Sequence, residues 1–258
     1  MVARLIVAIG VLTMIIAMCS SHGLNAMEEL DPYTLQQVFC RFPFAKVISL
    51  DEGEAWGLLY ADAYGKLYLL RSTSKGWKLE WRLANLGSKI RNFFVRDIDG
   101  DGVPEIIVAT FNGRILVYSM DNYQNVWENL EDNFTHIAVM EIENIDSDPQ
   151  PEFIILADSH LYIFDSLNKN HQWVSEREFE ATEIIIDNID KDDQLEIILN
   201  TGIVIDTRFY NIELEWDKPF GERIMAFDMN NDGFPEIIGE FSDYSLRIFD
   251  VYAQREVW

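Results

Sequence analysis

One acidic pattern recurs four times along the chain, and its spacing restricts the possible folds more than any other feature. The copies read DIDGDGVPE from Asp97, NIDSDPQPE from Asn144, NIDKDDQLE from Asn188 and DMNNDGFPE from Asp228. Their starts lie 47, 44 and 40 residues apart, and each copy leads into an apolar run. Periods of this length are typical of propellers and solenoids.

Five tryptophans give a second, independent register of the same repeat. Trp81, Trp127, Trp173, Trp216 and Trp258 lie 46, 46, 43 and 42 residues apart. Five regularly spaced tryptophans indicate five repeat units, one more than the four copies of the acidic pattern. In the extra unit, the first, Asp51 and Glu54 remain but the alternation of acids has been lost.

Each unit has the same internal plan, which predicts four strands. An apolar strand precedes the acidic loop, a second strand such as EIIVAT follows it, and a turn leads to a third strand such as RILVYS. Asn112-Gly113 between two apolar runs is a strong hairpin signal. A last short segment carries the tryptophan, which we expect to pack between neighbouring sheets.

Four-stranded units of about 45 residues are typical of β-propeller blades. We therefore predict an all-β fold, a β-propeller of about five four-stranded blades over residues 44–258. The predicted units are 44–81, 90–127, 136–173, 181–216 and 222–258, and residues 27–43 form a leader segment before them.

The acidic loops have the composition of calcium sites. Calcium prefers six to eight oxygen ligands, and acids at alternate positions can turn toward one ion. In the best copy the predicted ligands are the side chains of Asp97, Asp99, Asp101 and Glu105 with the carbonyl of Val103. The other loops would supply Asp228, Asn230, Asp232, Phe234 (carbonyl) and Glu236; Asn144, Asp146, Asp148 and Glu152; and Asn188, Asp190, Asp192 and Glu196. The alternative is that Asp, Asn and Gly only form the turn between two strands.

The loop pattern Asp-x-Asp-x-Asp-Gly-x-x-acid, placed between strands of a repeated blade, resembles the FG-GAP or VCBS-type repeat. The resemblance covers about residues 90 to 250 and implies a propeller like that of integrin alpha subunits, with two to four structural calcium ions. Members of that family commonly end the loop with Asp, whereas this chain has Glu in all four copies.

The first residues predict export. An arginine, an apolar run from Leu5 to Met18 and a small-residue stretch ending at Ala26 are typical of a secretory signal peptide over residues 1–26. An uncleaved anchor and a lipidated Cys19 are the alternatives. We therefore expect a secreted, periplasmic or cell-surface protein without a membrane span once the signal has been removed.

The charge restricts the choice of partners. A net charge of -24 argues against nucleic acid or an anionic membrane as the main partner. The histidines have no metal-ligand spacing, and neither a phosphate-binding loop nor a serine nucleophile motif is present. We expect a monomeric, non-catalytic binding or adhesion module for a protein or a glycan. A small-propeller carbohydrate-active enzyme, either a glycosidase or a lyase, is the alternative.

Overall fold

The computed structural model describes residues 44–190 and 192–258, with the exception of the side chain of Glu52. The predicted signal peptide and leader, residues 1–43, lie outside the described residues. Within the described part of the chain, no helix is both long enough and apolar enough to cross a membrane.

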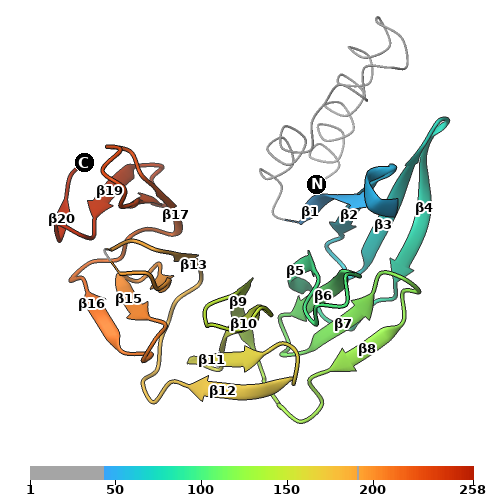
Figure 1. Cartoon of the computed structure of the whole chain (residues 1–258), viewed down its shortest axis with the longest axis horizontal. Helices are drawn as coiled ribbons and strands as arrows, with labels where there is room; N and C mark the ends of the chain where they lie inside the picture. The colour runs from blue at the N-terminus through green and yellow to red at the C-terminus, as the bar shows by residue number, and fades with distance from the viewer. Residues whose placement is uncertain (1–43, 191) are drawn as a thin grey trace, which may run out of the picture. The chain divides into compact units, whose positions relative to one another are not determined.

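The described chain forms five antiparallel sheets of four strands each, and the strands of each sheet are neighbours in the order of the sequence (Figure 1). The first sheet contains β1 (Ala45–Leu50), β2 (Ala55–Ala61), β3 (Leu67–Thr73) and β4 (Gly76–Leu83), with a 3-10 turn, η2 (Asp51–Gly53), between its first two strands. The second contains β5 (Ile90–Arg96), β6 (Glu105–Thr110), β7 (Ile115–Ser119) and β8 (Asn125–Glu128).

The remaining three sheets repeat this plan. The third contains β9 (Ile137–Glu143), β10 (Glu152–Ala157), β11 (His160–Asp165) and β12 (Asn170–Val174). The fourth contains β13 (Ile184–Asp187), β14 (Glu196–Leu199), β15 (Ile203–Asp206) and β16 (Ile212–Glu215). The fifth contains β17 (Arg223–Phe227), β18 (Glu236–Glu240), β19 (Leu246–Asp250) and β20 (Arg255–Glu256). Each sheet is called a blade below.

The chain divides into two compact units. The described part of the first unit is the first blade without residues 63–66, and its centre consists of the fully buried side chains of Leu59, Leu67 and Leu69. The second unit contains residues 63–66 and the other four blades.

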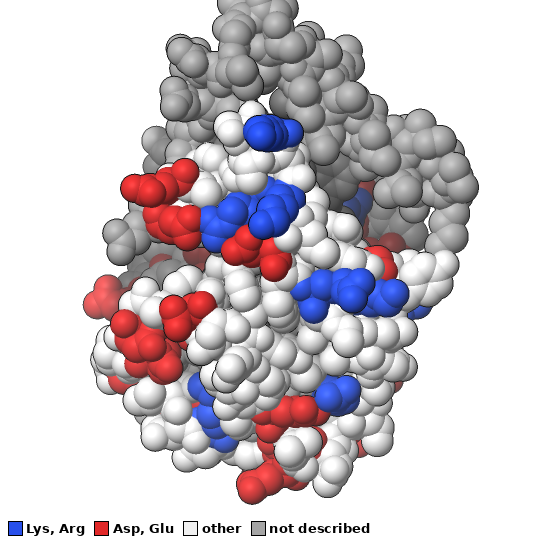
Figure 2. All heavy atoms as spheres, turned by 90° about the vertical axis from the view of Figure 1, so that its right-hand side faces the viewer, with Lys and Arg blue, Asp and Glu red and all other residues white. Residues whose placement is uncertain are grey.

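Charge is distributed unevenly along the repeats. Residues 44–83 contain 6 Lys or Arg against 5 Asp or Glu, whereas residues 181–258 contain 6 against 18, a net charge of -12. The face drawn in Figure 2 carries several groups of Lys and Arg side chains among the Asp and Glu side chains. Residues 84–180 also contain 6 Lys or Arg against 18 Asp or Glu, so the second to fifth blades are acidic and the first is not.

In the second, third and fourth blades the second strand is buried on both faces, which explains why its sequence is a nearly continuous apolar run. Every residue of β6, β10 and β14 is buried. The hairpin predicted at Asn112-Gly113 joins β6 to β7. Gly113 has a φ of 88°, and a Cβ at this position would clash with the carbonyl of Phe134, so this turn requires glycine.

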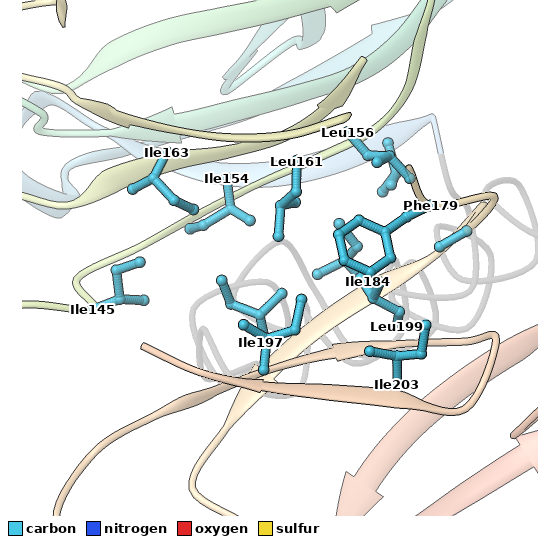
Figure 3. Close-up of a cluster of buried hydrophobic side chains, with 13 residues drawn as sticks. Ile145, Ile154, Leu156, Leu161, Ile163, Phe179, Ile184, Ile197, Leu199 and Ile203 are labelled. Carbon is cyan, nitrogen blue, oxygen red and sulfur yellow. The ribbon is translucent and has the colours of Figure 1, made fainter. Parts of the chain in front are cut away.

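Adjacent blades share apolar cores. Ile154 and Ile163 of the third blade meet Ile184 and Ile197 of the fourth in one such cluster (Figure 3). Three of the repeated tryptophans reach the next blade, as predicted, whereas Trp258 is 69% exposed, so the prediction is wrong for that residue. Ring centroids lie 6.4 Å apart for Trp127 and Phe153, 4.8 Å for Trp173 and Tyr210, and 6.1 Å for Trp216 and Phe249.

Polar side chains also join the first strands of neighbouring blades. Three residues of β5 donate hydrogen bonds to backbone carbonyls of β9, whose edge faces them. Asn92 donates to Met140 at 2.9 Å, Arg96 donates to Ile142 at 2.5 Å, and Arg91 donates to Ala138. These bonds satisfy carbonyls on a strand edge that has no backbone partner.

Candidate functional site: the acidic loops of the blades

The four acidic loops connect the first and second strands of blades two to five. In the loop of residues 97–105 the carboxylates accept hydrogen bonds from the backbone of the same loop. The two oxygens of Asp97 accept from Gly100 at 2.7 Å and from Gly102 at 2.9 Å. Asp99 accepts from the amide of Asp101, and Asp101 from that of Val103. The loop is thus ordered by its own side chains.

Two features are common to all four loops. The side chain at the third position accepts from the amide of the fifth, and the side chain at the fifth accepts from the amide of the seventh. These bonds involve Asp99 and Asp101; Asp146 and Asp148; Asp190 and Asp192; and Asn230 and Asp232. The glutamate at the ninth position accepts from the amide of the second, through Glu105, Glu152, Glu196 and Glu236.

The first position divides the loops into two classes. Asp228, like Asp97, accepts hydrogen bonds from the loop backbone, from the amides of Asn231 at 2.6 Å, Asp232 at 3.2 Å and Gly233 at 2.9 Å. Asn144 and Asn188 instead donate from their amide groups to the carbonyls of Asp148 and Asp192, at 2.6 and 2.8 Å. Aspartate at this position adds a negative charge, whereas asparagine closes the loop with a neutral donor.

The closing glutamates lie beneath the loops, in contact with the apolar interior. Glu105, Glu152 and Glu196 are at most 4% exposed. Burial, together with the negative charges of the loop aspartates, raises the pKa of Glu105 and of Glu152 to about 7 and that of Glu196 to about 8. The amide bond from the second position partly offsets this rise in each pKa.

Three groups of carboxylates have oxygens within 4.8 Å of one another. They are Asp97, Asp99 and Asp101; Asp146, Asp148 and Glu152; and Asp190, Glu196 and Glu213. Since calcium–oxygen distances are about 2.3 to 2.6 Å, oxygens this close can share one ion. The structure does not bring Glu105 into the first group or Asp192 into the third. The loop of residues 228–236, where Asn230 replaces one acid, is in none of the groups found among the described residues.

Glu213 belongs to β16 and was not predicted as a site residue. Its carboxyl group is hydrogen-bonded to that of Asp190, and burial together with this bond raises the pKa of Glu213 to about 7. No signal within one loop could have identified it, because Glu213 lies three strands after β13 and meets the loop only in the folded blade.

A residue of the following blade approaches each of three loops. It lies four positions after the third strand of its blade and has a positive φ: 57° for Lys169, 53° for Tyr210 and 51° for Gln254. Lys169 interacts electrostatically with Asp99 and Glu105, and Tyr210 with Glu152 and Asp146. Burial and these carboxylates raise the pKa of Tyr210 to about 12.

Gln254 differs from its two counterparts because it lines a cavity of about 240 Å³ beside the loop of the fourth blade. Asp190 and Glu213 form one part of the lining, Val204 and Leu214 another, and Tyr252 lies next to Gln254 on the side of the fifth blade.

In the first blade the remnant of the loop pairs with an arginine. Arg71 of β3 forms ion pairs with Asp51, in η2, and with Glu80, in β4, the latter at 3.0 Å. The acids of this blade therefore have a counter-charge from the chain itself.

The chain was compared with known proteins. No family model and no curated protein matches it. Similar solved structures include BBS1N in complex with ARL6DN (12% identity, TM-score 0.59), BamB from Moraxella catarrhalis (15%, 0.50) and Sqt1 from Saccharomyces cerevisiae (10%, 0.55). The matches cover 84%, 82% and 83% of this chain and 67%, 62% and 67% of the others, so the chain spans about two thirds of their length.

At sequence identities of 10% to 15%, the similarity to these structures shows a shared fold and nothing more. The three neighbours are β-propeller proteins, and the described chain has the five four-stranded blades that the repeats predicted. The fold is a β-propeller.

Proposed function

We propose that this protein is a non-catalytic β-propeller that binds a partner protein through its loops. The observation that carries the proposal is the order within the loops: each of the four is fixed by hydrogen bonds between its own side chains and backbone. A surface ordered before binding loses little conformational entropy when a partner docks. The solved complex of BBS1N with ARL6DN supports a protein partner by analogy of fold.

The acidic loops are the second reason for a binding role. All three groups of close carboxylates found in the described residues contain loop residues, and none lies along the first strands of the blades. A glycosidase would need two carboxyl groups that flank the scissile bond, whereas Asp190 and Glu213, which line the described cavity, are hydrogen-bonded to each other. The arrangement therefore favours loop stabilisation and surface charge over acid–base chemistry.

Calcium forms part of the proposal. Asp97, Asp99 and Asp101 offer hard oxygen ligands close enough to share one ion, and the loop from Asp228 has the same aspartate at its first position. Calcium would hold each loop in its present shape and offset the repulsion between its acids. In the loops from Asn144 and Asn188 the asparagine amide already joins the two sides, so calcium there stays a prediction with a weaker basis.

Export completes the proposal, because extracytoplasmic calcium is abundant enough to fill modest sites. Mass spectrometry of the protein secreted by its own host tests this part. A mature chain that begins at residue 27 supports export, and an intact Met1 in a cytoplasmic fraction overturns it.

The binding function is tested with purified protein. The tagged chain is cross-linked in an extract of its host, and the captured protein is then purified and titrated against the chain by calorimetry. The expected result is one stoichiometric protein partner whose affinity falls at least tenfold when loop acids are neutralised. Binding of glycans alone, or cleavage of a polysaccharide, would overturn the proposal.

A further inference from the structure

The cavity of about 240 Å³ beside Gln254 has the composition of a pocket for an organic cation. Asp190 and Glu213 line one side of it, and their oxygens lie within 4.8 Å of each other and of an oxygen of the buried Glu196. Val204 and Leu214 provide apolar surface. Glu213 and Tyr252 are solvent-exposed, so the cavity is accessible from outside.

The equivalent position one blade earlier contains Tyr210, and the position two blades earlier contains a lysine. Lys169 lies at the same turn position as Gln254, with a similar φ. Its half-buried ammonium group donates to the carbonyl of Ser166, lies 5.8 Å from the centroid of the Phe153 ring and interacts with Asp99 and Glu105. This molecule thus already contains a primary ammonium group on an aliphatic stem, placed over an acidic loop between two blades.

Among the described residues, neither Gln254 nor any other residue that lines the cavity brings a positive charge to the acids of the fourth blade. Arg71 provides a positive charge for the acids of the first blade, and Lys169 provides one for the acidic loop of the second. Asp190 and Glu213 instead face the cavity. Residues 181–258 carry a net charge of -12, as do residues 84–180, so net charge attracts a basic partner to the second to fifth blades and the cavity has to select where its lysine binds.

We propose that the cavity lined by Asp190, Glu213 and Gln254 binds the side chain of a lysine from a basic segment of a partner protein. The aliphatic stem would lie on Val204 and Leu214, and the ammonium group would bind the two carboxylates, as Lys169 approaches Asp99 and Glu105. This inference rests on the proposed function, because it assumes that the partner is a protein.

The chemistry of the cavity is tested first, without a partner. Gln254→Lys restores the lysine at the turn, so its ammonium group should reach the acids and raise Tm by several degrees at pH 7. Gln254→Met, which has a similar length and no charge, should not raise it. The reciprocal variant Lys169→Gln should lower Tm. A Tm of Gln254→Lys that is no higher than that of Gln254→Met overturns the inference.

Docking is tested by fluorescence anisotropy in 0.15 M salt, where the Debye length is about 8 Å and distant charges contribute little. The probe is a fluorescein-labelled peptide of eight alternating lysines and glycines, and the same peptide with acetylated lysines is its control. The double variant Asp190→Asn, Glu213→Gln should bind the lysine peptide at least tenfold more weakly than the wild type. The exposed pair Asp121→Asn with Glu131→Gln removes the same charge from the second blade and should change binding less than twofold.

Each outcome decides one question. If both double variants lost the same amount of affinity for the peptide, net charge alone would explain its binding, and the proposed pocket would be overturned. Calcium binding that depends on Asp190 and Glu213, without binding of the lysine peptide, would identify a metal site instead and would also overturn it. A failure of the proposed function is separate: the host extract would yield no protein partner, although Gln254→Lys would still raise Tm.

Discussion

The hydroxyl of Ser166 donates to the carbonyl of Ile98 at 2.7 Å, which joins the third blade to the acidic loop of the second. Both residues are at most 1% exposed, so neither group can form a bond to water instead. Ser166→Ala leaves a buried carbonyl without this donor, which costs about 1 to 3 kcal/mol. Urea unfolding should show that loss. The exposed Ser242→Ala serves as the control, and equal stability of the two variants would refute a structural role for the bond.

Packing between blades predicts a larger effect. Ile197 is fully buried in the cluster between the third and fourth blades (Figure 3), so Ile197→Ala should destabilise the protein by about 2 to 5 kcal/mol through lost burial and a new cavity. Leu130, which is 75% exposed, provides the matched control. If Leu130→Ala unfolded at as low a urea concentration as Ile197→Ala, the assignment of this core would be wrong.

Calcium removal is the test of the loops. A ligand present at 100 times its Kd stabilises the folded state by about 2.7 kcal/mol, so excess chelator should lower Tm measurably. Asp99→Ala should remove more of the calcium effect than Asp193→Ala, because Asp193 is exposed and outside the group of close carboxylates. The idea of structural calcium fails if Tm is unchanged in protein that elemental analysis shows to be free of metal.

Much of the fold could be predicted because the information is local and repeated. The period of the acidic loops and tryptophans indicated five four-stranded units, and Asn112-Gly113 marked a hairpin that the structure contains. The spacing also identified the acids that come together at Asp97, Asp99 and Asp101.

The rest of the site depends on contacts between blades or strands that no single repeat encodes. Lys169 approaches a loop of the preceding blade, and Glu213 meets Asp190 only after β16 pairs with β15. The spacing also did not indicate that Asn144 and Asn188 donate their amide hydrogens, since asparagine can serve as ligand or donor.

The buried glutamates predict how stability changes with pH in the metal-free protein. Glu105 and Glu152 have pKa values of about 7, and Glu196 of about 8, all above the ordinary value of 4.5. A group whose folded pKa is raised stabilises the protein fully below its unfolded pKa, and this stability is lost as pH rises through the folded pKa. The free energy of unfolding in chelator should therefore fall between pH 5.5 and pH 8.5.

Glu196→Gln isolates one of these groups. Glutamine keeps an oxygen for the amide of Ile189 but cannot ionise, so the variant's gain over the wild type should be larger at pH 8.5 than at pH 5.5 by at least about 1 kcal/mol. Glu222→Gln, at an exposed glutamate, should leave the pH profile unchanged. Urea unfolding at both pH values measures the difference. A wild-type stability that rises over this range would mean that the closing glutamates remain ionised beneath their loops, held by the backbone amides alone.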